Sequence, residues 1–326
     1  MVATALVLWI TLVSFYPEYL WFSSFNFASI WWTTLTHTLG YALAGFGISA
    51  LWFYCFDWRL EKVLFKTPKD SLFSFVSPAF SQVLTQLNLL KNPSGKPFKK
   101  SLLWTIGIAF FFGLWTKSHW QTIALYLYQT PYGVSDPIFG HDVSFYFFSL
   151  PFFEFVYHGC LGLVLITLIR TLVVSVTYSG IASLFSPYIQ KNSLKTHLFS
   201  LVGLFIGLLS LAYFFKPFDL LYSKRGVVFG AGFTDVHTQL WGYMVSGIAL
   251  SCAAVLVIIW GYRRDYKPLL IALATLAGLI FIVNGLYPGM VQSYQVAPNE
   301  LAKEKPYLTH NIHFTRLAYK DRKSVV

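Results

Sequence analysis

Glu154 and His158 are the residues whose types and spacing most directly suggest chemistry. They lie four residues apart in an apolar segment, so a helix would place both on one face. A carboxylate and an imidazole inside an apolar helix could form a proton or cation site. The alternative is that Glu154 lies in the first helical turn, where a carboxylate complements the helix N-terminus and still reaches water. We favour this alternative. Two further polar residues, His37 and Asn284, also lie in apolar segments.

Two polar segments, 132–145 and 219–237, contain the remaining candidates. These are Asp136, His141 and Asp142 in the first segment, and Arg225, Asp235 and His237 in the second. Their histidines and aspartates could supply nitrogen and oxygen ligands to a metal, or the acid and base groups of an enzyme. Such spacings are common by chance, so we favour ordered, glycine-rich loops. The Gly-Ala-Gly at 230–232 lacks the remainder of any nucleotide-binding motif. We therefore assign no catalytic residue, metal or cofactor.

The composition defines the class of protein that must position these residues. Of 326 residues, 56% are hydrophobic and only 11% are charged, whereas about a quarter of the residues in a soluble domain are charged. Soluble, disordered and fibrous classes are excluded, and a multi-pass membrane protein in contact with a lipid bilayer is expected. The net charge of +11 is interpreted as a record of loop orientation and not of nucleic-acid binding.

The apolar segments predict an all-α integral membrane protein, a bundle of about seven transmembrane helices within residues 1–287. A crossing needs about 20 apolar residues, and the expected spans are 2–15, 34–56, 102–115, 149–169, 198–215, 241–262 and 269–287. The first could instead be a signal peptide, but it lacks a basic start and a cleavage site, so a retained helix is favoured. Pairs of small residues four apart predict close helix packing within the chain; they are Gly40 and Ala44, Gly203 and Gly207, and Gly247 and Ser251. The three cysteines, Cys55, Cys160 and Cys252, are expected to be buried thiols.

The basic residues predict the orientation. Fourteen of them lie in the three even-numbered loops and four in the odd-numbered loops. Because basic loops stay in the cytoplasm, the N-terminus is expected inside and the C-terminal tail outside. The loop 57–101 is then cytoplasmic, and the pattern from Ser77 to Leu87 predicts an amphipathic helix within it. The tail, 288–326, is charged and is expected to begin an extracytoplasmic domain, with a helical stripe at Leu308, Ile312 and Tyr319.

Three long segments resemble a known family. They are 132–152 (YGVSDPIFGHDVSFYFFSLPF), 219–237 (DLLYSKRGVVFGAGFTDVH) and 287–319 (YPGMVQSYQVAPNELAKEKPYLTHNIHFTRLAY), and they look like signature stretches of uncharacterised protein family 0182. The resemblance implies a bacterial membrane protein with about seven helices followed by a large extracytoplasmic domain. It transfers no activity and no catalytic residue. It also implies that this sequence is truncated before that domain.

Three functions follow as hypotheses. The first is a membrane anchor or envelope scaffold in the bacterial plasma membrane, for which envelope proteins are candidate partners. The second is a transporter or channel for a small solute or ion. A faint similarity between the two polar segments, interpreted as a parallel repeat, supports this hypothesis. The third is an enzyme at the outer face of the membrane. The sequence indicates no oligomeric state.

Overall fold

The computed structural model describes residues 15–65, 97–179, 193–225, 229–263 and 267–319. Within these ranges nearly all regular structure is helical, with one isolated bridge between Ser135 and Asp142. The chain divides into two compact units, one of residues 1–57 and 94–130 and the other of residues 58–93 and 131–326. The first expected span, 2–15, and the amphipathic helix expected from Ser77 lie outside the described residues, except Phe15.

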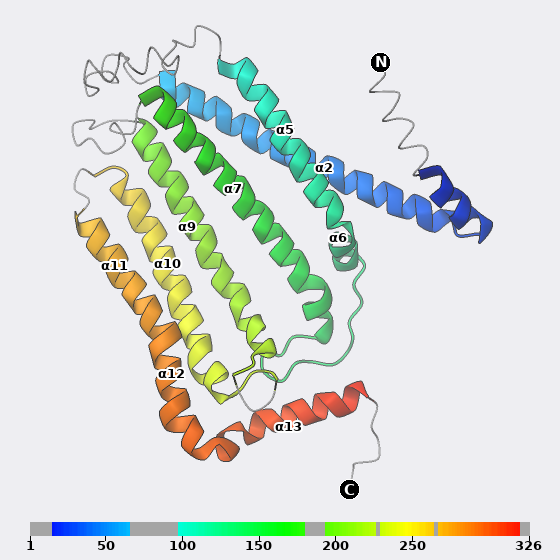
Figure 1. The fold of residues 1–326 in the computed structure, drawn as a ribbon, viewed down its shortest axis with the longest axis vertical. Coiled ribbons are helices and arrows are strands. Elements are labelled where there is room, and N and C mark those ends of the chain that lie inside the picture. Colours follow the sequence, from blue (N-terminus) through cyan, green and yellow to red (C-terminus); the bar gives the residue numbers. More distant parts are fainter. Residues whose placement is uncertain (1–14, 66–96, 180–192, 226–228, 264–266, 320–326) are drawn as a thin grey trace. The chain divides into compact units, whose positions relative to one another are not determined.

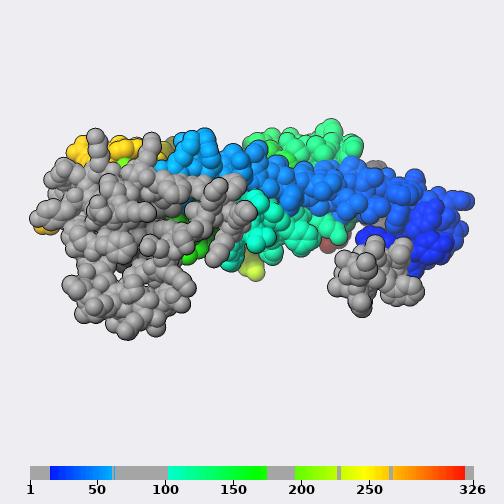
Figure 2. Space-filling view, turned by 90° about the horizontal axis from the view of Figure 1, so that it is seen from above, coloured from blue at the N-terminus to red at the C-terminus, as the bar shows by residue number. Residues whose placement is uncertain are grey.

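The first unit is built on two long helices, α2 and α5, which lie against each other (Figure 2). Their bounds are Ala28–Phe65 for α2, which continues past this unit, and Pro97–Ser118 for α5; the short α6, Trp120–Leu127, follows. Glycines allow the close approach: a Cβ at Gly113 would lie 2.9 Å from the carbonyl oxygen of Ala42. The Thr105 hydroxyl also donates to the buried carboxylate of Asp57 at 2.9 Å.

The second unit is a row of long helices crossed at one end by a final helix, α13 (Figure 1). In chain order the elements are η1 (Phe145–Ser149), α7 (Leu150–Ser179), α9 (Ser193–Asp219), η2 (Leu220–Tyr222), η3 (Asp235–Gln239), α10 (Leu240–Trp260), α11 (Lys267–Phe281), η4 (Ile282–Leu286), α12 (Tyr287–Val291), η5 (Gln292–Val296), η6 (Ala297–Asn299) and α13 (Glu300–Ala318). Each of η1 and η3 is a π-helical turn that runs directly into the α-helix after it, so each polar segment leads straight into a long helix.

Small residues bring α9 and α10 together, as two of the three predicted pairs require. A Cβ at Gly203 would lie 2.9 Å from the carbonyl oxygen of Ala254, and Gly247 packs on the side chain of Tyr213. The Ser251 hydroxyl donates to Ser210 across the same contact at 3.1 Å. The third pair differs, because a Cβ at Gly40 would meet no described atom within 4 Å.

Within the described residues, five helical segments are long and apolar enough to cross a membrane. They are Ala28–Leu60, Phe145–Val174, Lys195–Tyr222, Asp235–Trp260 and Lys267–Ala318. The expected span at 102–115 is a shorter apolar helix, Leu102–Ser118. The predicted number of seven spans is therefore not reached in the described part of the chain. The helices are also longer than the apolar segments from which they were predicted, because flanking aromatic and polar residues continue the helical turns.

The last of these segments is much longer than the predicted span 269–287. At 1.5 Å per residue, its 52 residues would measure roughly 80 Å, far more than the ~30 Å hydrocarbon core. The chain changes direction at η6, where the backbone of Asn299 leaves helical geometry with φ −141° and ψ 51°. The part before η6 is long enough for a crossing, and α13 is a separate helix.

The prediction of buried thiols is wrong. Cys55, Cys160 and Cys252 are all free and exposed. Each lies in a helix whose apolar residues also face away from the protein, including Leu51, Val156 and Ile248. In a membrane protein an apolar neighbourhood in sequence is satisfied by lipid as well as by a protein core.

Candidate functional site

The first polar segment is braced by its two aspartates. The Asp142 carboxylate accepts backbone N–H groups from Tyr132 at 3.0 Å, Gly133 at 2.7 Å and Ser144 at 2.7 Å. The Asp136 carboxylate accepts those of Ile138 at 3.1 Å and Phe139 at 2.6 Å. Both carboxylates therefore satisfy backbone donors of the turn and of the helix start, a use that favours loop bracing over catalysis.

Hydrogen bonding also sets the ionisation of Asp142. Bonds from Ser144, first from its side chain and then from its backbone, together with those from Tyr132 and Gly133, lower the pKa of this carboxyl to about 2. A carboxylate that accepts several N–H bonds is stabilised in its charged form. Asp142 is consequently an anion at any physiological pH and is a poor general acid.

His141 is part of an aromatic cluster. Its ring stacks on Phe145 with a centroid distance of 4.4 Å and meets the edge of Phe218 at 5.8 Å. Phe218 lies near the end of α9 and also contacts Phe139 and Tyr146. The cluster therefore fastens the first polar segment to α9, and stacking is the main observed environment of this imidazole.

The helix that starts in the second polar segment has an acidic residue, Asp235, at its third position. The helix starts at Phe233, and the Asp235 carboxylate accepts the N–H of Gly232 at 3.2 Å, as in a capping box. Asp235 is only 2% exposed, and its other oxygen lies 3.8 Å from the guanidinium of Arg225. Arg225 in turn donates to the side-chain oxygen of Gln239 at 2.9 Å. Arg225 and Asp235, both predicted as candidates, thus lie together.

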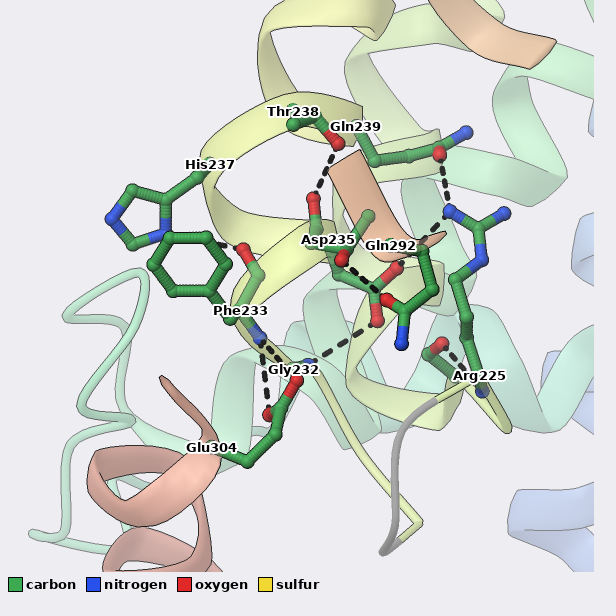
Figure 3. Close-up of polar contacts among 11 residues, drawn as sticks. Arg225, Gly232, Phe233, Asp235, His237, Thr238, Gln239, Gln292 and Glu304 are labelled. Carbon is green, nitrogen blue, oxygen red and sulfur yellow. Dashed lines mark hydrogen bonds and ion pairs between the residues drawn. The ribbon is translucent and has the colours of Figure 1, made fainter. Parts of the chain in front are cut away.

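The C-terminal tail completes this helix start (Figure 3). Both carboxylate oxygens of Glu304 in α13 lie 3.2 Å from the backbone nitrogen of Phe233, and Glu304 is only 4% exposed. The Thr234 hydroxyl donates to the Gln292 side-chain oxygen. Asn311 donates to the carbonyl oxygen of Phe229 at 2.8 Å. We call the contacts of Gln292, Glu304 and Asn311 with residues 229–234 the tail clamp.

His237 lies at the edge of the tail clamp and not against Asp235. Its ring stacks on Phe233 with a centroid distance of 4.1 Å, and its Nδ1 lies 3.3 Å from the Tyr307 hydroxyl. The Lys303 ammonium lies 4.6 Å from the centre of the Phe233 ring. The aromatic ring of Phe233 is thus enclosed by a histidine from its own helix and a lysine from the tail.

The remaining candidates lie elsewhere in the second unit. Glu154 is half-buried and His158 exposed on α7, and Nδ1 of His158 bonds the backbone carbonyl of Glu154 at 2.7 Å. The histidine therefore contacts the backbone of Glu154, while a joint proton or cation site stays a prediction. The favoured prediction that Glu154 lies in the first helical turn is wrong, because helical structure begins at Val143, 11 residues earlier. Asn284 donates to the Ser246 hydroxyl and to the carbonyl of Ile280, which ties η4 to α10. In the first unit, His37 pairs with the Tyr41 hydroxyl at 3.1 Å.

Metal binding receives no support from the arrangement. Among the residues that the structure describes, no three His, Cys, Asp or Glu side chains gather as a metal ion would require. The aspartates of the two polar segments direct their oxygens to backbone N–H groups and to Arg225. The hypothesis of shared ligation by the two segments therefore stays without a structural counterpart in the described ranges.

Sequence reasoning missed the tail residues of this site. Glu304, Gln292 and Asn311 lie in the family-like segment 287–319, but nothing in that segment assigns them a role, and they contact residues that are 58 to 82 positions earlier in the chain. Gly232 and Asp235 have the three-residue spacing of a capping box, although no capping box was predicted from the sequence. Gly232 has no side chain to complete the box, and no local pattern shows that Glu304 accepts the N–H of Phe233.

Comparisons with known proteins agree on one family. The model of the uncharacterised protein family UPF0182 matches residues 1–323. A UPF0182 protein of Pelotomaculum thermopropionicum is 31% identical over 310 residues, which cover 93% of this chain and 33% of the relative. UPF0182 proteins of Synechococcus sp. (strain JA-2-3B'a(2-13)) and Moorella thermoacetica are each 30% identical, covering 94% of this chain and 35% and 33% of the relatives.

The chain spans about a third of the length of these curated relatives. No solved structure matches it. The family model covers nearly the whole sequence, including both polar segments and the tail clamp. The chain therefore belongs to the uncharacterised protein family UPF0182.

Proposed function

We propose that this chain is a membrane anchor that presents polypeptide beyond α13 at a fixed position on the outer side of the membrane. The observation that carries the proposal is the tail clamp. Glu304 is buried and bonds the first turn of a helix that belongs to a candidate span. A helix held in this way leaves the bundle in a fixed direction, and we call it a rigid exit.

Two further facts support an anchor. Five described segments are suited to crossing a membrane, and the matched relatives are about three times as long as this chain. The aspartates of the polar segments brace backbone, which suits a scaffold. The outer location of the tail rests on the distribution of basic residues in the loops.

Distance measurements between spin labels test the rigidity of the exit. Spin labels would be attached to cysteines introduced at the exposed positions Trp241 in α10 and Thr309 in α13. The full chain, with its three exposed cysteines replaced by serine, would be reconstituted in nanodiscs. A narrow distance distribution is expected, and Glu304→Ala combined with Asn311→Ala should broaden it. Glu300→Ala, an exposed change on the same helix, is the matched control. A broad distribution in the unmutated protein would contradict a fixed exit.

A reporter fusion tests the location. Alkaline phosphatase fused after residue 326 should be active in intact bacteria, because that enzyme folds only outside the cytoplasm. The same reporter fused after Arg263, in the basic loop after α10, should be inactive. The reverse pattern would place the tail in the cytoplasm and overturn the proposal.

Transport is the second candidate, and Glu154 is the observation that favours it. The side chain is half-buried within a candidate span, one helical turn before His158. Ionisable residues at such positions commonly belong to solute or proton pathways. Ion flux into proteoliposomes that is lost in Glu154→Gln would support transport, and the absence of flux would leave the anchor as the stronger account.

A further inference from the structure

Helix α13 has a second face that the tail clamp does not use. Glu304, Tyr307 and Asn311 lie on one side of the helix at spacings of three and four. About a quarter turn away, at 100° per residue, four apolar side chains lie along one line of the helix. They are Leu301, Leu308, Ile312 and the C-terminal cap residue Tyr319.

This apolar stripe is largely uncovered. Leu301 is 75% exposed, Ile312 50% and Tyr319 83%. Lys305 and Arg316, both exposed, each follow a stripe residue by four positions and so lie along its edge. A narrow apolar stripe bordered by basic side chains is one feature of helices that lie in a membrane interface.

The position of α13 places this stripe at the end of the membrane-crossing helices. The helix runs across that end of the second unit (Figure 1), and it forms the end of the last candidate segment, after η6. The exposed tyrosines Tyr287 and Tyr294 precede it by a few turns. Aromatic side chains of this kind concentrate at the level of the lipid headgroups, so α13 lies near the same level.

We propose that α13 is an interfacial helix whose apolar stripe inserts between the headgroups of the adjacent leaflet, with Lys305 and Arg316 on the phosphates of anionic phospholipids. The charge complementarity selects lipid over a second copy of the chain or a further segment of polypeptide. The basic stems can cover apolar surface while their charged ends reach the phosphates. The proposal does not depend on the anchoring role, because a transporter could use the same contact.

Fluorescence quenching tests the contact in the full chain. Cys55, Cys160 and Cys252 are exposed and would be replaced by serine, and the dye NBD would then be attached at Ile312→Cys or, as a matched control, at His310→Cys. His310 is also exposed but lies on nearly the opposite side of α13. The nanodiscs would contain phosphatidylglycerol and a lipid with a doxyl group near the headgroup.

The label at residue 312 should emit at shorter wavelength and be quenched by the doxyl lipid, whereas the label at residue 310 should be quenched by aqueous iodide. Equal quenching of both labels by iodide would overturn the proposal. Protection of residue 312 from both quenchers would also overturn it, because protein and not lipid would then cover the stripe.

The charged part of the contact needs its own measurement. Lys305→Glu with Arg316→Glu should move the emission of the label at residue 312 to longer wavelength, and nanodiscs of phosphatidylcholine alone should do the same to the unmutated helix. His310→Glu, which adds one negative charge on nearly the opposite side of α13, is the control. Emission that responds to neither change would rule out the contact with anionic phospholipid.

Discussion

The backbone N–H of Phe233 is capped by the carboxylate of Glu304, a residue 71 positions later in the chain. Helix starts leave several N–H groups without partners, and these are usually satisfied within a few residues. Here Asp235 provides the local acceptor for Gly232, and the tail provides the next one. The start of the helix that becomes α10 is therefore complete only when α13 is in place.

Removing the Glu304 carboxylate should open the first turn of that helix. Glu304→Ala leaves a partly buried N–H without its acceptor, which costs on the order of 1–3 kcal/mol. Hydrogen exchange followed by mass spectrometry should show faster exchange at residues 232–236 and at α13. Glu304→Gln retains an acceptor oxygen and should lie between Glu304→Ala and the unmutated protein. Unchanged exchange in Glu304→Ala would show that the cap does not hold the tail.

Removing Arg225 should destabilise the second unit by leaving the buried Asp235 without its cation. The loss of one partner of a fully buried pair costs about 3–5 kcal/mol, but Arg225 is partly exposed to solvent, so Arg225→Met should cost less, about 1–3 kcal/mol. Adding Asp235→Asn removes the unpaired charge and should recover part of the loss. Thermal unfolding of the two single variants and the double variant measures the coupling; simple additivity would contradict a direct interaction.

The first polar segment should lose stability in acid. The pKa of Asp142 is about 2 in the folded loop, below the ordinary value of 3.8, so its ionised form favours the folded state. This contribution is fully present above the unfolded pKa and is lost as the pH falls from about 4 through 2. Melting temperatures of the unmutated protein and Asp142→Asn should differ near neutral pH and converge near pH 2. The exposed change Tyr132→Phe, which keeps the backbone donor, is the control, and parallel curves for Asp142→Asn would contradict this role.

The contact between α9 and α10 predicts a difference between two glycines one turn apart. A Cβ at Gly203 would lie 2.4 Å from Ile258 and 2.9 Å from the Ala254 carbonyl oxygen, whereas one at Gly207 would lie 3.8 Å from Ala254. Gly203→Ala should cost about 1–3 kcal/mol through overpacking. Gly207→Ala should be tolerated, since its new methyl group meets only ordinary contact. Equal unfolding temperatures for both variants in detergent would argue against this helix packing.

Local patterns predicted the helices and much of their packing. The apolar segments from 149 to 287 all lie in long helices, and the small-residue pairs at Gly203 and Gly247 lie at a helix contact. The spacing of Gly40 and Ala44 could not show whether another helix packs on them, because the same spacing occurs on helix faces with and without a neighbouring helix. The exposure of Cys160 shows the related difficulty: an apolar sequence does not tell whether its neighbour is protein or lipid.

Only the residues of the candidate site that lie close together in the sequence were predictable. Arg225 and Asp235 could be selected as polar residues of one loop, and their pairing needs only a short return of the chain. Glu304 could not, because its role depends on a change of direction at Asn299 that brings α13 back over the loop. A single acidic residue in a charged tail has the same local appearance whether it faces water or caps a distant helix.

The cap on Phe233 also sets an order of events during synthesis. The ribosome adds roughly 5–20 residues per second, so the 71 residues between the donor and its acceptor take about 4–14 s to appear. During that interval the helix that contains α10 can enter the membrane with its first turn incomplete. Release of the chain before residue 304 would leave that turn permanently open, so a product cut short there should be recognised by proteases that attack frayed helix ends.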